Sequence, residues 1–149
     1  MSIGRFGPEL TITLRLDPYA PRAARYHVAQ VDRPSPDLRD AVVLLTSELV
    51  TRAVQQSEQA SDAAIELRVW MPADVVRVEL QASNELLPAP ETDALDYGLL
   101  LLDRIADRWS IDHAGDLACM WFEIDRHPVV APDLGPSGGR RAHASAVAR

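Results

Sequence analysis

The chain has 149 residues, the usual size of one folded domain, with 47% hydrophobic and 25% charged residues. Its formal net charge of -7 argues against a nucleic-acid-binding protein, which needs a basic surface to neutralise phosphates. Cys119 is the single cysteine, so an internal disulfide is excluded, a thiolate zinc site is disfavoured, and a reducing cytoplasm is the expected compartment. The scattered histidines predict no metal site, and no apolar run approaches the ~20 residues needed to span a bilayer.

The first half of the chain predicts one strand and two helices. Apolar residues alternate over residues 10–16, which indicates a strand with one buried face. Pro21 can open a short helix, and Pro36, preceded by Ser35 as a candidate N-cap, can open a long helix that ends near Gln56. The long helix has apolar residues all round, so we expect other elements to cover more than one of its sides. Its main apolar face consists of Leu38, Val42, Leu45, Leu49 and Ala53.

The second half predicts a hairpin, a long loop, a third helix and a closing strand. Residues 65–69 and 76–80 alternate on either side of a turn that contains Pro72. Residues 82–96 are rich in proline and acid and read as a long loop, which in a compact domain is usually a binding lid or disordered. The third helix is expected to carry Leu95, Leu99, Leu102, Ala106 and Trp109. A short strand over residues 110–112 is a further candidate, and the last strand presents Met120, Phe122 and Ile124 on one face.

This order of elements predicts helices packed on one face of a largely antiparallel sheet, which is a two-layer α+β sandwich. We expect one domain over residues 1–127. Residues 128–149 are rich in proline, glycine and small residues and predict a disordered tail.

Several stretches, in the same order, resemble one family. Residues 37–51 resemble the N-box helix of GHKL (histidine-kinase-like) ATPases, and are most similar to the small bacterial anti-sigma factor serine kinases. Residues 76–88 resemble the strand and loop of the next nucleotide motif, and residues 97–109 the glycine-containing lid with its helix. Residues 120–123 resemble the closing strand. The resemblance covers roughly residues 10–124 and implies a Bergerat sandwich, in agreement with the order of elements.

The resemblance also implies a chemistry. Glu48 stands at the position of the general base, which acts on water or on a partner's serine hydroxyl. In the family, an asparagine one turn later binds Mg²⁺, an aspartate at a strand end accepts the adenine amino group, and glycines let backbone N–H groups approach the nucleotide. The positions that would contact a nucleotide are Arg52, Ala82, Asn84, Gly98, Leu99 and Cys119.

This sequence departs from the family pattern at most of these positions. Arg52 replaces the asparagine, and Ala82 falls where the adenine-binding aspartate belongs. The other departures are Asn84 and Leu86 at two glycine positions, Asp96 and Tyr97 where the lid reads glycine and arginine, and Ala118 where relatives often carry lysine. We therefore expect weak or absent binding of ATP and Mg²⁺, and no cofactor.

Glu48 and Arg52 each allow two interpretations. Glu48 is either a surviving catalytic base or half of an i,i+4 ion pair with Arg52, which would contribute only ~0.3–0.5 kcal/mol. Arg52 either binds phosphate directly, since guanidinium suits phosphate geometry, or closes an abandoned pocket by pairing with Glu48.

Three hypotheses for the function follow. The first is a degenerate regulatory protein that acts by contact with a protein partner, such as a sigma factor or an anti-anti-sigma protein. The second is an active ATP-dependent serine kinase with Glu48 as its base. The third is an accessory subunit that forms a homodimer or pairs with an intact relative. None involves nucleic acid or a membrane.

Overall fold

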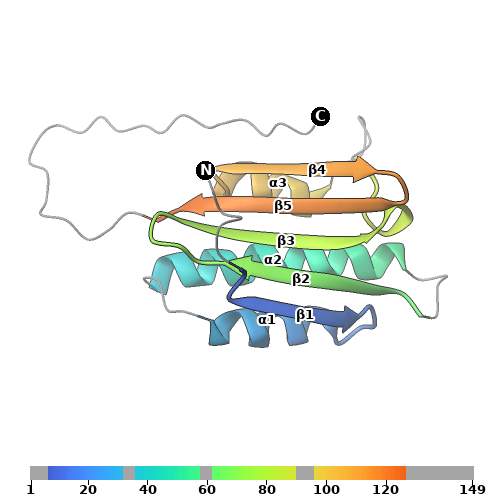
Figure 1. Cartoon of the computed structure of the whole chain (residues 1–149), viewed down its shortest axis with the longest axis horizontal. Helices are drawn as coiled ribbons and strands as arrows, with labels where there is room; N and C mark the ends of the chain where they lie inside the picture. The colour runs from blue at the N-terminus through green and yellow to red at the C-terminus, as the bar shows by residue number, and fades with distance from the viewer. Residues whose placement is uncertain (1–6, 32–35, 58–61, 90–95, 127–149) are drawn as a thin grey trace, which may run out of the picture.

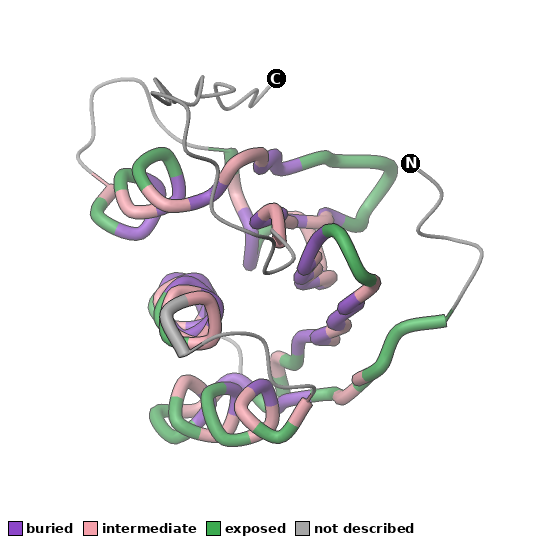
Figure 2. Tube along the Cα trace, turned by 90° about the vertical axis from the view of Figure 1, so that its left-hand side faces the viewer, coloured by how far each residue is buried: buried purple, intermediate pink, exposed green. Residues whose placement is uncertain are grey.

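One open sheet and three helices make up the part of the chain that the computed structural model describes, which is residues 7–31, 36–57, 62–89 and 96–126. The antiparallel strands lie in the order β1-β2-β3-β5-β4 (Figure 1). The strands are β1 (Leu10–Arg15), β2 (Ala64–Trp70), β3 (Val75–Ser83), β4 (Arg108–Ala114) and β5 (Leu117–Asp125). The helices are α1 (Ala20–Gln30), α2 (Pro36–Gln56) and α3 (Tyr97–Ile105), and all three lie on the same side of the sheet (Figure 2). The predicted two-layer α+β sandwich is confirmed.

The core lies between the sheet and the helices, because strand residues alternate between the two faces of the sheet. One row of apolar side chains crosses all five strands in register on the helix side. The row runs through Ile12, Leu67, Leu80, Met120 and Ile111. Met120 and its neighbour on β3, Leu80, are completely buried, as the alternation in the sequence predicts.

Helix α2 is the centre of the helical layer. Leu45, Leu49 and Ala53 are completely buried on it and point to the core, as predicted from their spacing. α1 contacts it along one side and α3 along the other, which confirms that this apolar helix is covered on more than one side. Its first residue is Pro36, as expected, while the candidate N-cap Ser35 lies outside the described residues.

The chain between residues 82 and 114 differs from the prediction in two ways. First, the expected long loop is shorter, because β3 continues to Ser83 and a short 3-10 helix, η2 (Asn84–Leu86), follows directly. Second, Trp109 does not belong to the third helix. α3 ends at Ile105, the backbone of Ala106 is extended, and Trp109 pairs with Phe122 in β4. The helical spacing that included Trp109 was therefore wrong, and the short strand expected at residues 110–112 is a full edge strand.

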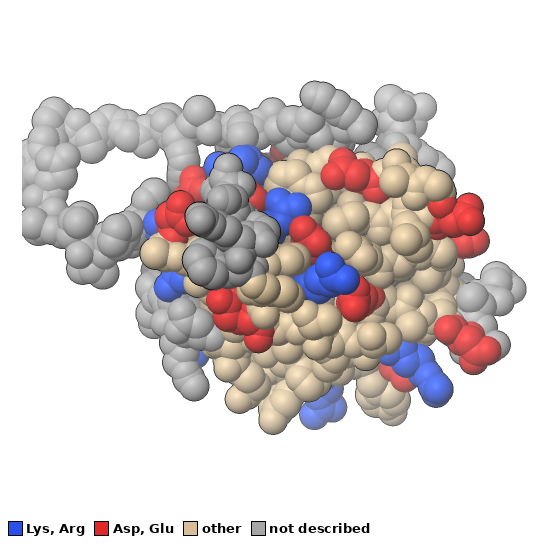
Figure 3. All heavy atoms as spheres, in the orientation of Figure 1, with Lys and Arg blue, Asp and Glu red and all other residues tan. Residues whose placement is uncertain are grey.

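The opposite face of the sheet is polar and held by ion pairs, with acidic and basic side chains side by side (Figure 3). Arg77 donates to Glu79 at 2.8 Å and to Glu123 at 2.7 Å, and its guanidinium lies 4.2 Å from the ring centroid of Trp121. Arg108 donates to the other oxygen of Glu123 at 2.8 Å. Cross-strand pairs of opposite charge satisfy one another in water, so this face needs no second layer to cover its polar groups.

Two further expectations concern the C-terminal tail and the membrane. The predicted tail, residues 128–149, lies outside the described residues. No helix in the described ranges is long and apolar enough to cross a bilayer.

The two faces of α2 predict different costs for the same substitution. Leu49→Ala removes a fully buried side chain and should lower the free energy of unfolding by about 2–5 kcal/mol, through lost burial and the cavity left behind. Leu44→Ala, on the same helix at 40% exposure, is the matched control and should cost less than about 1 kcal/mol. Urea denaturation followed by circular dichroism measures both, and equal costs would show that the helix faces are assigned wrongly.

Candidate functional site

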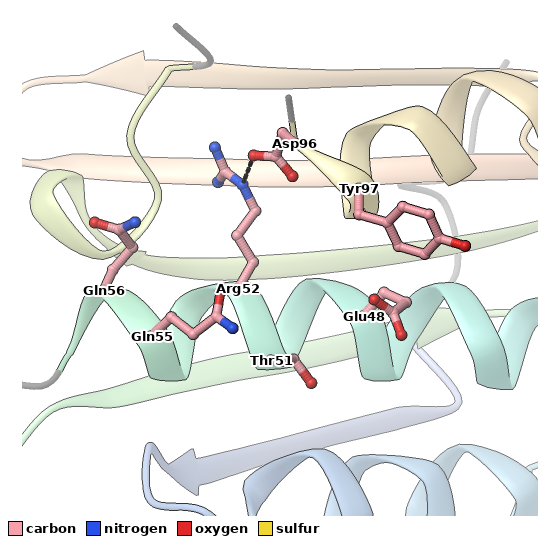
Figure 4. Close-up of a pocket in the computed structure, with 8 residues that line it drawn as sticks. Glu48, Thr51, Arg52, Gln55, Gln56, Asp96 and Tyr97 are labelled. Carbon is pink, nitrogen blue, oxygen red and sulfur yellow. Dashed lines mark hydrogen bonds and ion pairs between the residues drawn. The ribbon is translucent and has the colours of Figure 1, made fainter. Parts of the chain in front are cut away.

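The candidate site is a pocket of about 460 Å³ between α2 and the start of α3 (Figure 4). Helix α2 supplies one wall and the first turn of α3 supplies the other. The lining residues are Glu48, Thr51, Arg52, Gln55, Gln56, Asp96, Tyr97 and Gly98. The pocket therefore contains Glu48, Arg52 and Gly98 from the set predicted by the sequence.

Arg52 is the most constrained side chain of this pocket. Only 8% of the residue is exposed. Its Nε donates to Oδ2 of Asp96 at 2.7 Å, and its Nη2 donates to the carbonyl oxygen of Pro88 at 3.1 Å. The buried Nη1 has no hydrogen-bond partner among the residues that the structure describes. Pro88 and Asp96 stand on either side of residues 90–95, so one guanidinium joins the chain before and after that segment. We call this set of contacts the Arg52 clasp.

Asp96 uses its two carboxylate oxygens for different purposes. Oδ2 accepts from Arg52, while Oδ1 accepts from the backbone N–H of Leu99 at 3.2 Å and caps the first turn of α3. The carboxylate also lies at the positive end of the helix dipole, where a negative charge is stabilised. Asp96 thus fixes the start of α3 and attaches it to α2.

Of the two interpretations of Glu48 and Arg52, the ion pair between them is wrong. Arg52 pairs with Asp96, which is 44 residues away in the sequence, instead of with the glutamate one turn earlier on the same helix. Within the described part of the chain, no group donates a hydrogen bond to the Glu48 carboxylate, which is partly exposed at the pocket. The bond to Asp96 is the stronger interaction, because it is short, charge-assisted and largely buried, whereas a pair along the surface of a helix is exposed to solvent.

Gly98 brings α3 close to α2 at this point. A Cβ added to Gly98 would lie 3.6 Å from Oδ1 of Asp96 and 3.8 Å from the backbone oxygen of Glu48. These are ordinary van der Waals distances, so the buried glycine marks a close approach of the helices without being sterically required there.

The other predicted nucleotide positions do not join the pocket. Ala82, Leu86 and Leu99 are buried members of the hydrophobic core. Asn84 turns away toward the connection between β4 and β5, where its Nδ2 donates to the carbonyl oxygen of Gly115 at 2.7 Å. Leu86 borders a separate pocket of about 510 Å³, which is lined by residues of α2, β2 and the end of β3 and contains none of the other predicted nucleotide positions.

Cys119 lies on the other face of the sheet. Its register partners are Gln81 on β3 and Asp112 on β4, and the alternation of β5 points it away from the helices. Burial, followed by the nearby charge of Glu79, raises the pKa of its thiol to about 11. The thiol therefore stays protonated near neutral pH and cannot contribute to the pocket.

Sequence reasoning missed the partners of Arg52. The carbonyl of Pro88 has no sequence signal, because any residue could present it. Asp96 had one: an aspartate directly before an apolar helical segment is a typical N-cap. Thr51, Gln55 and Gln56 were also missed, although all follow Glu48 on the exposed side of the same helix.

The donor set of the pocket does not fit a magnesium nucleotide. Arg52 places a fixed positive charge at the position where the family resemblance predicts a metal ligand, and Ala82, at the predicted adenine position, has no side-chain acceptor. No group of three or more potential metal ligands exists among the residues that the structure describes. Comparisons of the sequence with protein-family models and with curated proteins give no match.

The Arg52 clasp can be tested with Asp96→Asn. Asparagine caps a helix about as well as aspartate, so this variant keeps the cap and removes only the charge. We expect a loss of roughly 1–3 kcal/mol in the free energy of unfolding, since the buried guanidinium loses its charged acceptor.

Glu66→Gln is the control for that measurement. This change breaks the ion pair between Glu66 and Arg68, whose side chains are 33% and 35% exposed, respectively. It should lower the free energy of unfolding by no more than about 1 kcal/mol. If Asp96→Asn is as mild as this control, the clasp does not stabilise the domain.

Proposed function

We propose that this chain is a regulatory protein related to the GHKL ATPases, which acts by binding a protein partner and has lost its nucleotide site. The partner belongs to sigma-factor control or a related partner-switching system. The observation that carries the proposal is the Arg52 clasp. A guanidinium stands at the expected metal position, and its Nε and Nη2 are taken by Asp96 and by the backbone of Pro88.

The energetics support loss of nucleotide binding. Without an acceptor at Ala82, a buried adenine would leave its amino group unpaired, at a cost of roughly 1–3 kcal/mol. That corresponds to about tenfold to a hundredfold in affinity. A phosphate that approached Arg52 would also have to displace Asp96, whose carboxylate already bonds the guanidinium and caps α3.

Titration calorimetry of the full chain with ATP, with and without Mg²⁺, tests this proposal. We expect no saturable heat up to millimolar ATP in either condition. Micromolar binding that needs Mg²⁺ would overturn the proposal. Micromolar binding without Mg²⁺ would instead support the phosphate-binding interpretation of Arg52, and Asp96→Asn should then strengthen it, because that change frees the guanidinium.

One observation favours the alternative, an active serine kinase. The carboxylate of Glu48 lines the pocket and has no hydrogen-bond donor among the described residues, so it is available to accept a proton from a partner's hydroxyl.

The alternative predicts transfer of phosphate from ATP to a serine of a candidate partner protein. Glu48→Gln should abolish that transfer, since the amide cannot act as a base. Glu85→Gln, at an exposed glutamate outside this pocket, is the matched control and should leave it unchanged. Absence of transfer by the wild-type chain to any candidate partner removes the support for a kinase.

A further inference from the structure

Among the residues that the structure describes, Glu48 has no partner, whereas the other carboxylates of the pocket and of the sheet are paired. Asp96 is held by Arg52, and Glu79 and Glu123 are held by Arg77. None of the described residues donates to Glu48 in the same way. It lines a pocket and is partly exposed, so a ligand can reach it. An unpaired carboxylate in a recess favours a ligand that brings a positive charge.

An aromatic ring stands next to this carboxylate. Tyr97, the first residue of α3, is 62% exposed and lines the same pocket, and its side chain points to the same side of the close-up view as that of Glu48 (Figure 4). Because both side chains line one pocket and the ring is exposed, a cation that bonds to the carboxylate can also be contacted by the ring, whose quadrupole attracts positive charge. The two groups come from different helices and are brought together by the close approach at Gly98.

Exposed apolar side chains flank the pair on both helices. Leu44 precedes Glu48 by one turn of α2, and Leu100 follows Tyr97 by one turn of α3. Each is 40% exposed. A charged centre with apolar borders fits a side chain that belongs to a peptide or protein better than it fits a free ion.

The charges of the pocket exclude the opposite choice, an anionic ligand. Among the described residues that line the pocket, only Arg52 is basic, and it is already bonded to Asp96 and Pro88. The two carboxylates outnumber it, and the whole chain has a formal net charge of -7. After Arg52 and Asp96 neutralise each other, the charge that remains in the described lining of the pocket is the negative charge of Glu48.

We propose that Glu48 and Tyr97 form a recognition site for an arginine side chain of the protein partner, with Leu44 and Leu100 contacting apolar residues beside it. Arginine fits better than lysine, because the planar guanidinium can bond a carboxylate with two N–H groups while it stacks on a ring. This inference rests on the proposed function and adds to it the place of contact and the chemistry of the partner.

The test is an NMR titration of the ¹⁵N-labelled full chain with the peptide acetyl-Leu-Arg-Leu-amide. The amides of Glu48, Tyr97 and Gly98 should shift together in a saturable way. The same peptide with citrulline for arginine keeps the shape but loses the charge, and should bind roughly tenfold more weakly.

Two variants locate the interaction. Glu48→Gln should lower the affinity for the arginine peptide roughly tenfold. Tyr97→Leu, which keeps an apolar side chain but has no ring, should lower it roughly threefold. Glu85→Gln, the same change at an exposed glutamate outside the pocket, should leave the affinity unchanged. Thermal unfolding verifies that each variant is folded, and Glu48→Gln should be as stable as the wild type because the carboxylate has no donor within the described chain.

The inference is overturned if the peptide does not bind at millimolar concentration, if the citrulline peptide binds equally well, or if Glu48→Gln has no effect. Shifts confined to the acidic groups of the sheet face, around Glu79 and Glu123, would also overturn it. These outcomes are distinct from those of the calorimetric test. Micromolar binding of ATP would refute the proposed loss of the nucleotide site, whereas absence of peptide binding would refute only the proposed arginine contact.

Discussion

The guanidinium of Arg52 joins three parts of the chain that are distant in sequence. It starts on the central helix α2 and reaches the carbonyl of Pro88 after η2 and the carboxylate of Asp96 before α3. Because Asp96 also caps α3, the position of this helix depends on the same carboxylate. A buried arginine is costly unless its donors are satisfied, so the clasp holds these segments in one arrangement. Its remaining unpaired atom, Nη1, is a local cost that the other two contacts offset.

The clasp also divides the pocket into two chemically different parts. On the side of Arg52 the charges are neutralised within the chain, and Ala82 and Leu86 belong to the core that backs this region. On the side of Glu48 the negative charge is unpaired and lies beside the exposed ring of Tyr97. The basic group of the pocket is thus already bonded within the chain, while the carboxylate of Glu48 is accessible. This division supports a binding role over a catalytic one.

Sequence periodicity predicted the fold because it records which side chains are buried. The alternation in β1, β2, β3 and β5 and the apolar face of α2 follow directly from burial on one side. Trp109 was assigned to the wrong element because an apolar residue three positions after Ala106 fits the face of a helix as well as the buried face of the next strand. The pairing of Arg52 with Asp96 was not predictable, since local spacing offered Glu48 first and long-range contacts leave no periodic signal. Cys119 was placed at the site by resemblance alone, whereas strand alternation puts it on the opposite face.

We expect Asp96 to hold Arg52 so firmly that a nucleotide cannot replace it. The Nε–H resonance of Arg52 in an arginine-selective ¹⁵N NMR spectrum reports this bond directly. We expect a sharp resonance that is protected from exchange with water, is lost in Asp96→Asn, and does not move when magnesium ATP is added to millimolar concentration. A saturable shift of this resonance at micromolar ATP, with the wild-type chain, would show that the clasp opens for nucleotide and that the nucleotide site is retained.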